Sequence, residues 1–223
     1  MRLAHIDHAG TSLDLLVHDD EYLSNQIVET GRFYESEILE TLRQHFPSQR
    51  TIIDVGANIG NHATFFARVL RPKRLVCFEP VPMNFEILQR NLDAHASDLV
   101  VHAHPVALGA SAGMVAMAVS PANMGGCEVV PGVPGSVEMR TLDSYDYDDV
   151  SLLKIDVENW YLDVLKGSIK TLLRSHPVVV TEGPFEEVFP ILGRLGYLCT
   201  AMWNIDVRTY LYQAKPFGLS RLT

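Results

Sequence analysis

The chain has 223 residues, of which 47% are hydrophobic and 20% are charged, and its formal net charge is −9. This length and composition predict one globular domain with a sizeable core. The negative charge, without any cluster of Lys or Arg, argues against nucleic acid as a partner. No apolar stretch approaches the roughly 18 residues of a membrane span, and no secretory signal is visible, so we expect a cytoplasmic protein away from membranes. Three scattered cysteines suit a reducing compartment.

The first 46 residues precede the predicted core. Loose alternation of apolar residues around a glycine turn predicts a β-hairpin over residues 1–18, with residues 13–17 as its second strand. Residues 19–30 predict a short helix that ends at Gly31. Residues 33–46 carry an apolar stripe at helical spacing and predict a second helix that packs on the sheet.

Strands then alternate with helices as far as residue 182, which predicts a doubly wound, mostly parallel α/β sheet. Two further strands close the chain as an antiparallel pair. The predicted strands cover residues 51–53, 74–78, 99–106, 151–155, 178–181, 197–202 and 208–212.

The alternation breaks between residues 109 and 149, where glycine and proline recur. Residues 114–119 and 137–139 predict short strands joined by loops. An insertion after the third core strand lies at the ligand-binding edge of such a sheet, so we assign it to substrate recognition, with a structural flap as the alternative. The predicted organisation is one domain over residues 1–223. It consists of an N-terminal extension (1–46) and a core (51–212) that contains the inserted region (109–149).

The first core strand ends at Asp54 and leads through a glycine turn into a helix. Gly56 and Gly60 frame this turn, which leaves backbone N–H groups and a positive helix end facing one crevice. The turn is not the dinucleotide fingerprint, because Asn58 and Asn61 stand where two of its glycines belong, and no Lys-Ser/Thr follows as in a P-loop.

The second core strand ends in Glu79, 19 residues after Gly60. A carboxylate at this place can accept hydrogen bonds from the hydroxyls of a ribose. A ribose site without a pyrophosphate turn favours a nucleoside that carries no pyrophosphate. S-adenosylmethionine fits that description.

Four sequence blocks occur in order: DVGANIG at 54–60, FEPVPMNF at 78–85, LKIDVE at 153–158 and VLKG at 164–167. Together they resemble the FkbM family of S-adenosylmethionine-dependent methyltransferases, over about residues 33 to 197. The resemblance implies a Rossmann-like class I methyltransferase fold with an antiparallel C-terminal strand pair. It also implies O-methylation of a hydroxyl on a small molecule or glycan, with S-adenosylhomocysteine as the product.

The glycine turn and the strand end predict how the cofactor is held. The turn is expected to hold the methionine part, because glycine allows close backbone approach. For Asn58 the alternative is a left-handed turn residue, and for Glu79 a surface carboxylate. By resemblance, Glu35 lies near the cofactor, with a solvated helix face as the alternative. The predicted cofactor-binding residues are Glu35, Asp54, Gly56, Asn58, Gly60, Glu79, Pro80, Val81 and Ala107.

Charged residues alternate at the end of the fourth core strand. If the strand continues, Lys154, Asp156 and Glu158 share one face and converge on the crevice, while the residues between them enter the core. Asp156 is the first candidate, and Glu158 the second, for positioning the acceptor hydroxyl or removing its proton. Lys154 either neutralises them or stabilises developing oxyanion charge. A structural ion-pair cluster is the alternative. His62, early in the first crossover helix, is a further possible base unless it lies on the helix surface.

Two alternatives to an active methyltransferase remain open. The family pattern has an acid where this chain has Tyr161, so one alternative is a cofactor-binding scaffold that has lost catalysis. A nicotinamide-dependent oxidoreductase is another, which the missing third glycine disfavours. His102 and His104 share a strand face but lack a third ligand at suitable spacing, so no metal site is predicted there. A divalent metal at Asp156 and Glu158 remains open.

Overall fold

The structure is a computed structural model that describes residues 1–46, 50–120, 123–133, 135–204 and 208–215. Its centre is a seven-stranded sheet in the order β12-β13-β11-β10-β3-β4-β5. Five strands run parallel, and β13 is antiparallel to both of its neighbours. The predicted doubly wound sheet and its closing antiparallel pair are therefore confirmed. The strands are β3 (Thr51–Val55), β4 (Arg74–Phe78), β5 (Val100–His104), β10 (Val150–Ile155), β11 (Val178–Glu182), β12 (Tyr197–Asn204) and β13 (Arg208–Ala214).

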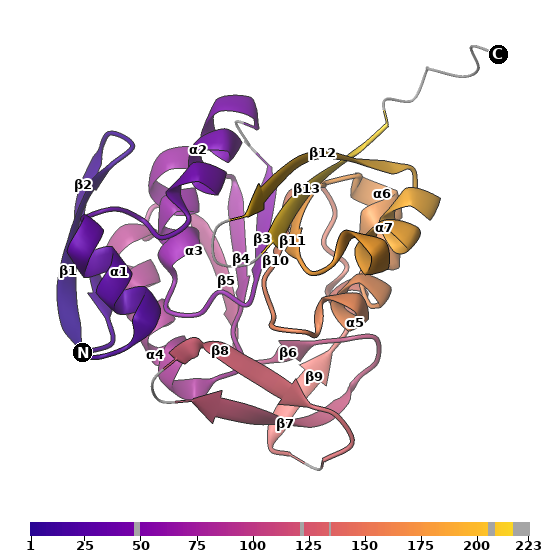
Figure 1. Cartoon of the computed structure of the whole chain (residues 1–223), viewed down its shortest axis with the longest axis horizontal. Coiled ribbons are helices and arrows are strands. Elements are labelled where there is room, and N and C mark those ends of the chain that lie inside the picture. Colours follow the sequence, from indigo (N-terminus) through magenta and orange to yellow (C-terminus); the bar gives the residue numbers. More distant parts are fainter. Residues whose placement is uncertain (47–49, 121–122, 134, 205–207, 216–223) are drawn as a thin grey trace.

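Helices cover both faces of this sheet (Figure 1). The predicted N-terminal hairpin is confirmed as β1 (Arg2–His8) and β2 (Thr11–Val17), and it packs on the same side as the first four helices. The helices of that side are α1 (Tyr22–Thr30), α2 (Ser36–His45), α3 (Asn61–Phe65) with a π-helical turn over Phe66–Leu70, and α4 (Pro82–His95). The helices of the other side are α5 (Tyr161–Lys166), α6 (Ile169–Ser175) and α7 (Phe185–Arg194).

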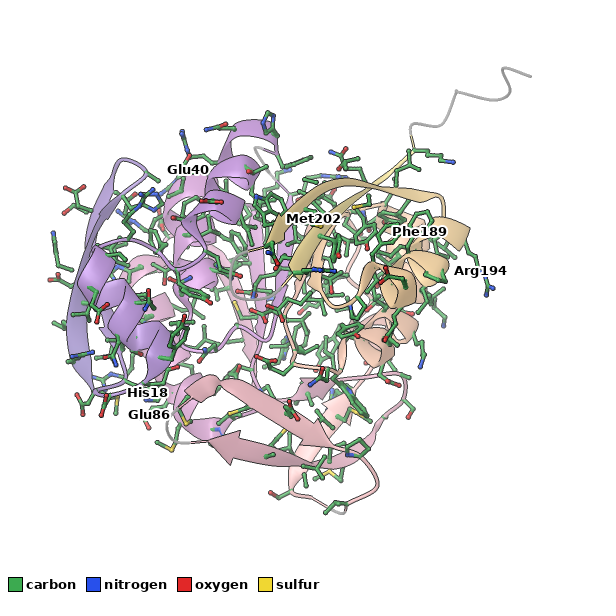
Figure 2. The ribbon with its side chains drawn as sticks, in the orientation of Figure 1. His18, Glu40, Glu86, Phe189, Arg194 and Met202 are labelled. Carbon is green, nitrogen blue, oxygen red and sulfur yellow. The ribbon has the colours of Figure 1, made fainter. Side chains whose placement is uncertain are left out.

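Two hydrophobic cores result from the two-residue period of the strands. Ile52 of β3 belongs to the core under α2, α3 and α4, while its neighbour Ile53 belongs to the core under α5, α6 and α7. Charged helix residues such as Glu86 and Arg194 lie at the outer surface (Figure 2). Within the described ranges, no helix combines the length and the apolar content needed to cross a bilayer.

The third core strand is shorter than predicted. β5 ends at His104, and Pro105, which has no N–H to donate to a ladder, separates it from β6 (Ala107–Leu108). β6 pairs with β9 (Val137–Arg140) in a second sheet. The third strand predicted over residues 99–106 is therefore confirmed as β5, which begins one residue later and ends two residues earlier than predicted.

The inserted region adds three strands to β6 in that second, four-stranded sheet, ordered β6-β9-β7-β8, with β7 (Gly113–Ser120) and β8 (Asn123–Val130) as a hairpin. Of this region, residues 121–122 and 134 lie outside the described ranges. Sequence analysis missed β8, which contains Gly125 and Gly126, because glycine is depleted in strands. The sheet lies below the lower ends of β3, β4 and β10 (Figure 1). It therefore closes one side of the crevice at these ends.

Candidate active site

The glycine turn after β3 makes direct contact with the end of β10. Gly56 has a φ of +76°, and a Cβ atom on it would lie 1.7 Å from the carbonyl oxygen of Asp156. No side chain fits there, so glycine is required both for the backbone conformation and for the close approach. β3 lies between β10 and β4, the point where the order of the strands reverses and where doubly wound sheets bind ligands.

The carboxyl group of Glu79 holds the turn from the neighbouring strand. Its Oε2 accepts a hydrogen bond from the backbone N–H of Asn58, and its Oε1 accepts one from the N–H of Val81, both at 2.8 Å. The residue is only 4% exposed, and this burial raises the pKa of Glu79 to about 7, although both N–H bonds act to lower it. The side chain of Glu79 therefore lies at the turn, and the alternative of a surface carboxylate is wrong.

A cavity of about 240 Å³ opens beside this turn. α1 and β8 of the second sheet form its far wall. The side chain of Asn84 in α4 donates a hydrogen bond to the backbone carbonyl of Met124 in β8 at 3.0 Å, which fixes β8 against α4. The predicted site residues that line it are Glu35, Gly56, Asn58, Glu79, Pro80, Val81, Ala107, Asp156 and Glu158. Asp54, Gly60, His62 and Lys154 do not line this cavity.

Lys154 forms a buried ion-pair network behind the cavity. Its Nζ lies 3.1 Å from Oδ1 of Asp54 and 3.0 Å from Oδ2 of Asp156. Burial by itself would lower the pKa of Lys154. The surrounding carboxylates, of which Asp156 has the largest effect, outweigh burial and raise this pKa above its ordinary value. Asp54 is fully buried, and this burial raises its pKa despite the lysine. Lys154 thus neutralises carboxylates of β3 and of the segment after β10.

The fourth strand predicted over residues 151–155 is confirmed, and the continuation through Glu158 that was considered does not occur. β10 ends at Ile155, and both Glu158 and Asn159 adopt left-handed backbone conformations, with φ of 33° and 59°. In this turn, Val157 packs against the core on the α5 side of the sheet and also contributes to the cavity wall. Left-handed non-glycine residues cost of order 1–3 kcal/mol each and cluster at functional sites. Glu158, whose pKa is raised by burial and by Asp156, reaches the cavity through this turn.

His62 and Glu35 lie side by side in the interior. Nε2 of His62 is 3.3 Å from Oε2 of Glu35, and both side chains are less than 10% exposed. The surface positions considered for both residues are therefore wrong. Burial lowers the pKa of His62 to about 3, helped by the charge of Lys154, so the imidazole is neutral. His62 lines a separate cavity of about 10 Å³.

Glu182, at the end of β11, is a site residue that sequence analysis missed. Its carboxyl is hydrogen-bonded to that of Asp156, and it lines both cavities described above. Burial and the charge of Asp156 raise the pKa of Glu182, whereas Lys154 lowers that of Asp156 against the effect of burial. The signal was available, because Glu182 ends a parallel strand as Glu79 does.

A third cavity, of about 270 Å³, adjoins the first and shares Glu158 and Glu182 with it. Tyr161 lines it, with its ring against Gly183 and its hydroxyl donating to Oε2 of Glu187 at 2.9 Å. Arg208 is the basic residue of this wall, and no ion pair joins it to the other described residues.

The strand order, the glycine turn and the acid at the end of β4 define a Rossmann-like class I methyltransferase fold. Residues 54–199 match the family model of the methyltransferase FkbM domain. The chain belongs to the FkbM methyltransferase family.

Two curated relatives are methyltransferases. The chain is 28% identical over 160 residues to methyltransferase sdnD of Sordaria araneosa, which covers 55% of the chain and 62% of that protein. It is 27% identical over 152 residues to the hexuronic acid methyltransferase AglP of Haloferax volcanii, which covers 66% of the chain and 61% of that protein. The chain thus spans less than two thirds of the length of either relative.

Solved structures share the fold at lower identity. An FkbM methyltransferase from Methylobacillus flagellatus superposes with a TM-score of 0.58 at 17% identity, over 89% of this chain and 56% of that one. A putative tRNA methyltransferase from Streptococcus pneumoniae gives 0.53 at 11% identity, over 82% and 72%. Proteins with very different names therefore share this architecture, so the substrate has to be argued from the site.

Proposed function

We propose that the protein transfers a methyl group from S-adenosylmethionine to a hydroxyl group of a small molecule or glycan. The observation that carries this proposal is Glu79, whose carboxyl spans the glycine turn and borders the 240 Å³ cavity. Each of its oxygens accepts one backbone N–H and keeps a second lone pair for a ribose hydroxyl. The acidic site and the net charge of −9 favour a cationic cofactor and disfavour nucleic acid as acceptor.

Several groups around the turn fit the rest of the cofactor. The side-chain Oδ1 of Asn58 is buried and accepts no hydrogen bond from the described part of the chain, so it is available to an N–H of the ligand. Pro80, Val81 and Ala107 offer apolar surface to the adenine from the ends of β4 and β5. The carboxylate of Glu35 borders the same cavity and suits the ammonium of the methionine part.

Methyl transfer requires the chain to orient an alcohol, accept its proton and exclude water. The cofactor supplies an electrophilic methyl group, which becomes bonded to the acceptor oxygen as its bond to sulfur breaks and sulfur keeps the electron pair. Asp156 is held by Lys154 at 3.0 Å and by Glu182, so it is fixed in place to position the hydroxyl. Glu158 borders both large cavities and takes the released proton in this proposal.

The acceptor enters this proposed reaction through the 270 Å³ cavity. Arg208 on its wall suits a carboxylate, since guanidinium pairs with carboxylates in a bidentate way. One relative is named as a hexuronic acid methyltransferase, which supports an acidic sugar as acceptor here. The ring of Tyr161 offers a flat surface for a sugar face in the same cavity.

Calorimetry tests whether the cofactor binds, and mass spectrometry of the acceptor tests whether a methyl group is transferred. We expect S-adenosylhomocysteine to bind with one site per chain, and mass spectrometry to detect a gain of one methyl group on a uronic acid or its glycoside. Binding of NADH in place of the adenosyl ligand would support the oxidoreductase. Cofactor binding without turnover of any hydroxylated acceptor would support the impaired scaffold.

A further inference from the structure

A second, much smaller cavity lies behind the large one. Its volume of about 10 Å³ is close to the minimum that a single water molecule or ion requires. Apolar side chains of α2, of the π-helical turn after α3, of β10 and of β11 form part of its wall, and polar groups from the residue before α2, from α3, β10, β11 and β13, and from the residue after β10 form the rest. The polar residues that line it are Glu35, His62, Lys154, Asp156, Glu182 and Thr209.

The imidazole of His62 points an unpaired nitrogen at these carboxylates. His62 is 7% exposed, and its Nε2 has no hydrogen-bond partner in the described ranges, although Oε2 of Glu35 lies only 3.3 Å away. The ring makes its other hydrogen bond to the backbone of Tyr34. Donation from one ring nitrogen to a backbone carbonyl is the arrangement that orients metal-binding histidines.

The separation of Nε2 and Oε2 also suits a shared cation. Ligand atoms about 2.1 Å from a metal, at tetrahedral or octahedral angles, are roughly 3.0–3.4 Å apart. Donor atoms of Glu35, His62 and Asp156 all lie within 4.8 Å of one another. One ion can therefore be reached by all three after small side-chain rotations.

Acidic side chains outnumber the one basic side chain in this region, which favours a cation there. Glu35, Asp54, Asp156 and Glu182 surround the single ammonium of Lys154. Four acidic side chains thus meet one ammonium in the interior. Buried charges of this kind are normally paired or coordinate a metal.

We propose that Glu35, His62 and Asp156 bind one divalent transition-metal ion in this small cavity. An imidazole with two carboxylates favours Mn²⁺, Fe²⁺, Co²⁺ or Zn²⁺ over Mg²⁺ and Ca²⁺, which prefer oxygen ligands alone. Because Glu35 and Asp156 also border the large cavity, the ion stands in the wall between the two. It holds both carboxylates in place beside the proposed methyl-transfer site, a role that the methyltransferase fold does not itself require.

Metal binding can be measured without any cofactor or acceptor. The full chain is stripped with chelator, desalted and titrated with Co²⁺, whose visible absorption reports nitrogen and oxygen ligands, and with Zn²⁺ by calorimetry. We expect one equivalent per chain and a higher Tm with metal than without. Binding of S-adenosylhomocysteine, measured in parallel on the stripped protein, keeps the test separate from the proposed reaction.

Two variants and a matched control identify the site. His62→Ala and Glu35→Gln should each weaken Co²⁺ binding at least 10-fold. His102→Ala should leave it unchanged, because that ring lies on β5 and hydrogen-bonds to the hydroxyl of Tyr147. Glu35→Gln preserves shape and keeps the test decisive if His62→Ala does not fold. Absence of saturable binding at millimolar Co²⁺, or binding that neither variant weakens, overturns the proposal and leaves a water molecule in the cavity.

Discussion

Replacing Glu79 by glutamine separates the binding of ribose from the folding of the turn. The substitution keeps the size of the side chain but leaves one acceptor oxygen where the structure uses two. Two backbone donors, the N–H groups of Asn58 and Val81, lie 2.8 Å from the present oxygens. In Glu79→Gln, one of them must face the amide NH2. The same substitution removes the negative charge from the group that is proposed to accept a hydrogen bond from a ribose hydroxyl.

Two opposing terms act on stability. Leaving one buried donor unpaired costs about 1–3 kcal/mol. In the other direction, the variant no longer buries a carboxylate whose pKa is raised from 4.5 to about 7. A difference of that size corresponds to about 3 kcal/mol at neutral pH. The two terms nearly cancel, so we expect little change in the free energy of unfolding of Glu79→Gln.

For cofactor binding, no second effect offsets the loss of the carboxylate in Glu79→Gln. A hydrogen bond to a charged group contributes about 1.5–3 kcal/mol, which predicts 10- to 150-fold weaker binding of S-adenosylhomocysteine to Glu79→Gln by calorimetry. Glu86→Gln is the matched control, because Glu86 lies exposed on the outer side of the neighbouring helix α4 (Figure 2). If Glu79→Gln binds as tightly as Glu86→Gln while remaining folded, Glu79 does not contact the ribose and the proposed binding mode is wrong.

Five further predictions concern Glu79 and other residues of the site. The affinity for S-adenosylhomocysteine should rise between pH 6 and pH 8, because Glu79 loses its proton near pH 7 and the carboxylate is the form that accepts ribose hydroxyls; calorimetry across this range should show a flat profile for Glu79→Gln. The same raised pKa makes the contribution of Glu79 to stability fall as pH rises from about 4.5 to 7, which urea unfolding measures. Gly56→Ala should yield no folded protein, or one without cofactor binding by calorimetry, since its Cβ would overlap the carbonyl oxygen of Asp156. Tyr161→Phe should lose about 1 kcal/mol in urea unfolding and keep its turnover, whereas Arg208→Gln should lower kcat/KM for a uronic acid more than for a neutral sugar.

The sheet was predictable because each of its signals is local. Ile52 and Ile53 mark a buried strand without any knowledge of the partner strands, and Gly56 marks the turn that follows. The second sheet was only partly predictable. β8 contains Gly125 and Gly126, and it forms a strand because β7 lies beside it. In β8, pairing with β7 outweighs the low strand propensity of glycine, and no local sequence pattern predicts this pairing.

The residues of the candidate site also fall into two groups, those whose positions could be predicted from the sequence and those whose positions could not. Glu79 and Asp156 follow strand ends directly, so the parallel sheet brings them to one edge whatever the rest of the chain does. His62 and Glu35 are different, because their contact depends on how the N-terminal extension packs against α3. Glu35 takes a left-handed conformation, with φ of 55°, just before α2 begins, and this directs its side chain inward. A helix over residues 33–46, as predicted, hides that bend and suggests a solvated face.

The burial of Lys154 explains why the acids at this edge are held so rigidly. Removing one partner of a buried ion pair typically costs 3–5 kcal/mol, since the other charge is left without compensation. Lys154 is paired with Asp54 from β3 and with Asp156 after β10, so the two halves of the sheet are joined at the point where the ligand crevice opens. The glycine turn contacts the backbone of Asp156 at the same place. A displacement of Asp156 therefore breaks the ion pair and the turn together. The position of Asp156, the carboxylate that we propose to orient the acceptor, is thus fixed by the packing of the fold.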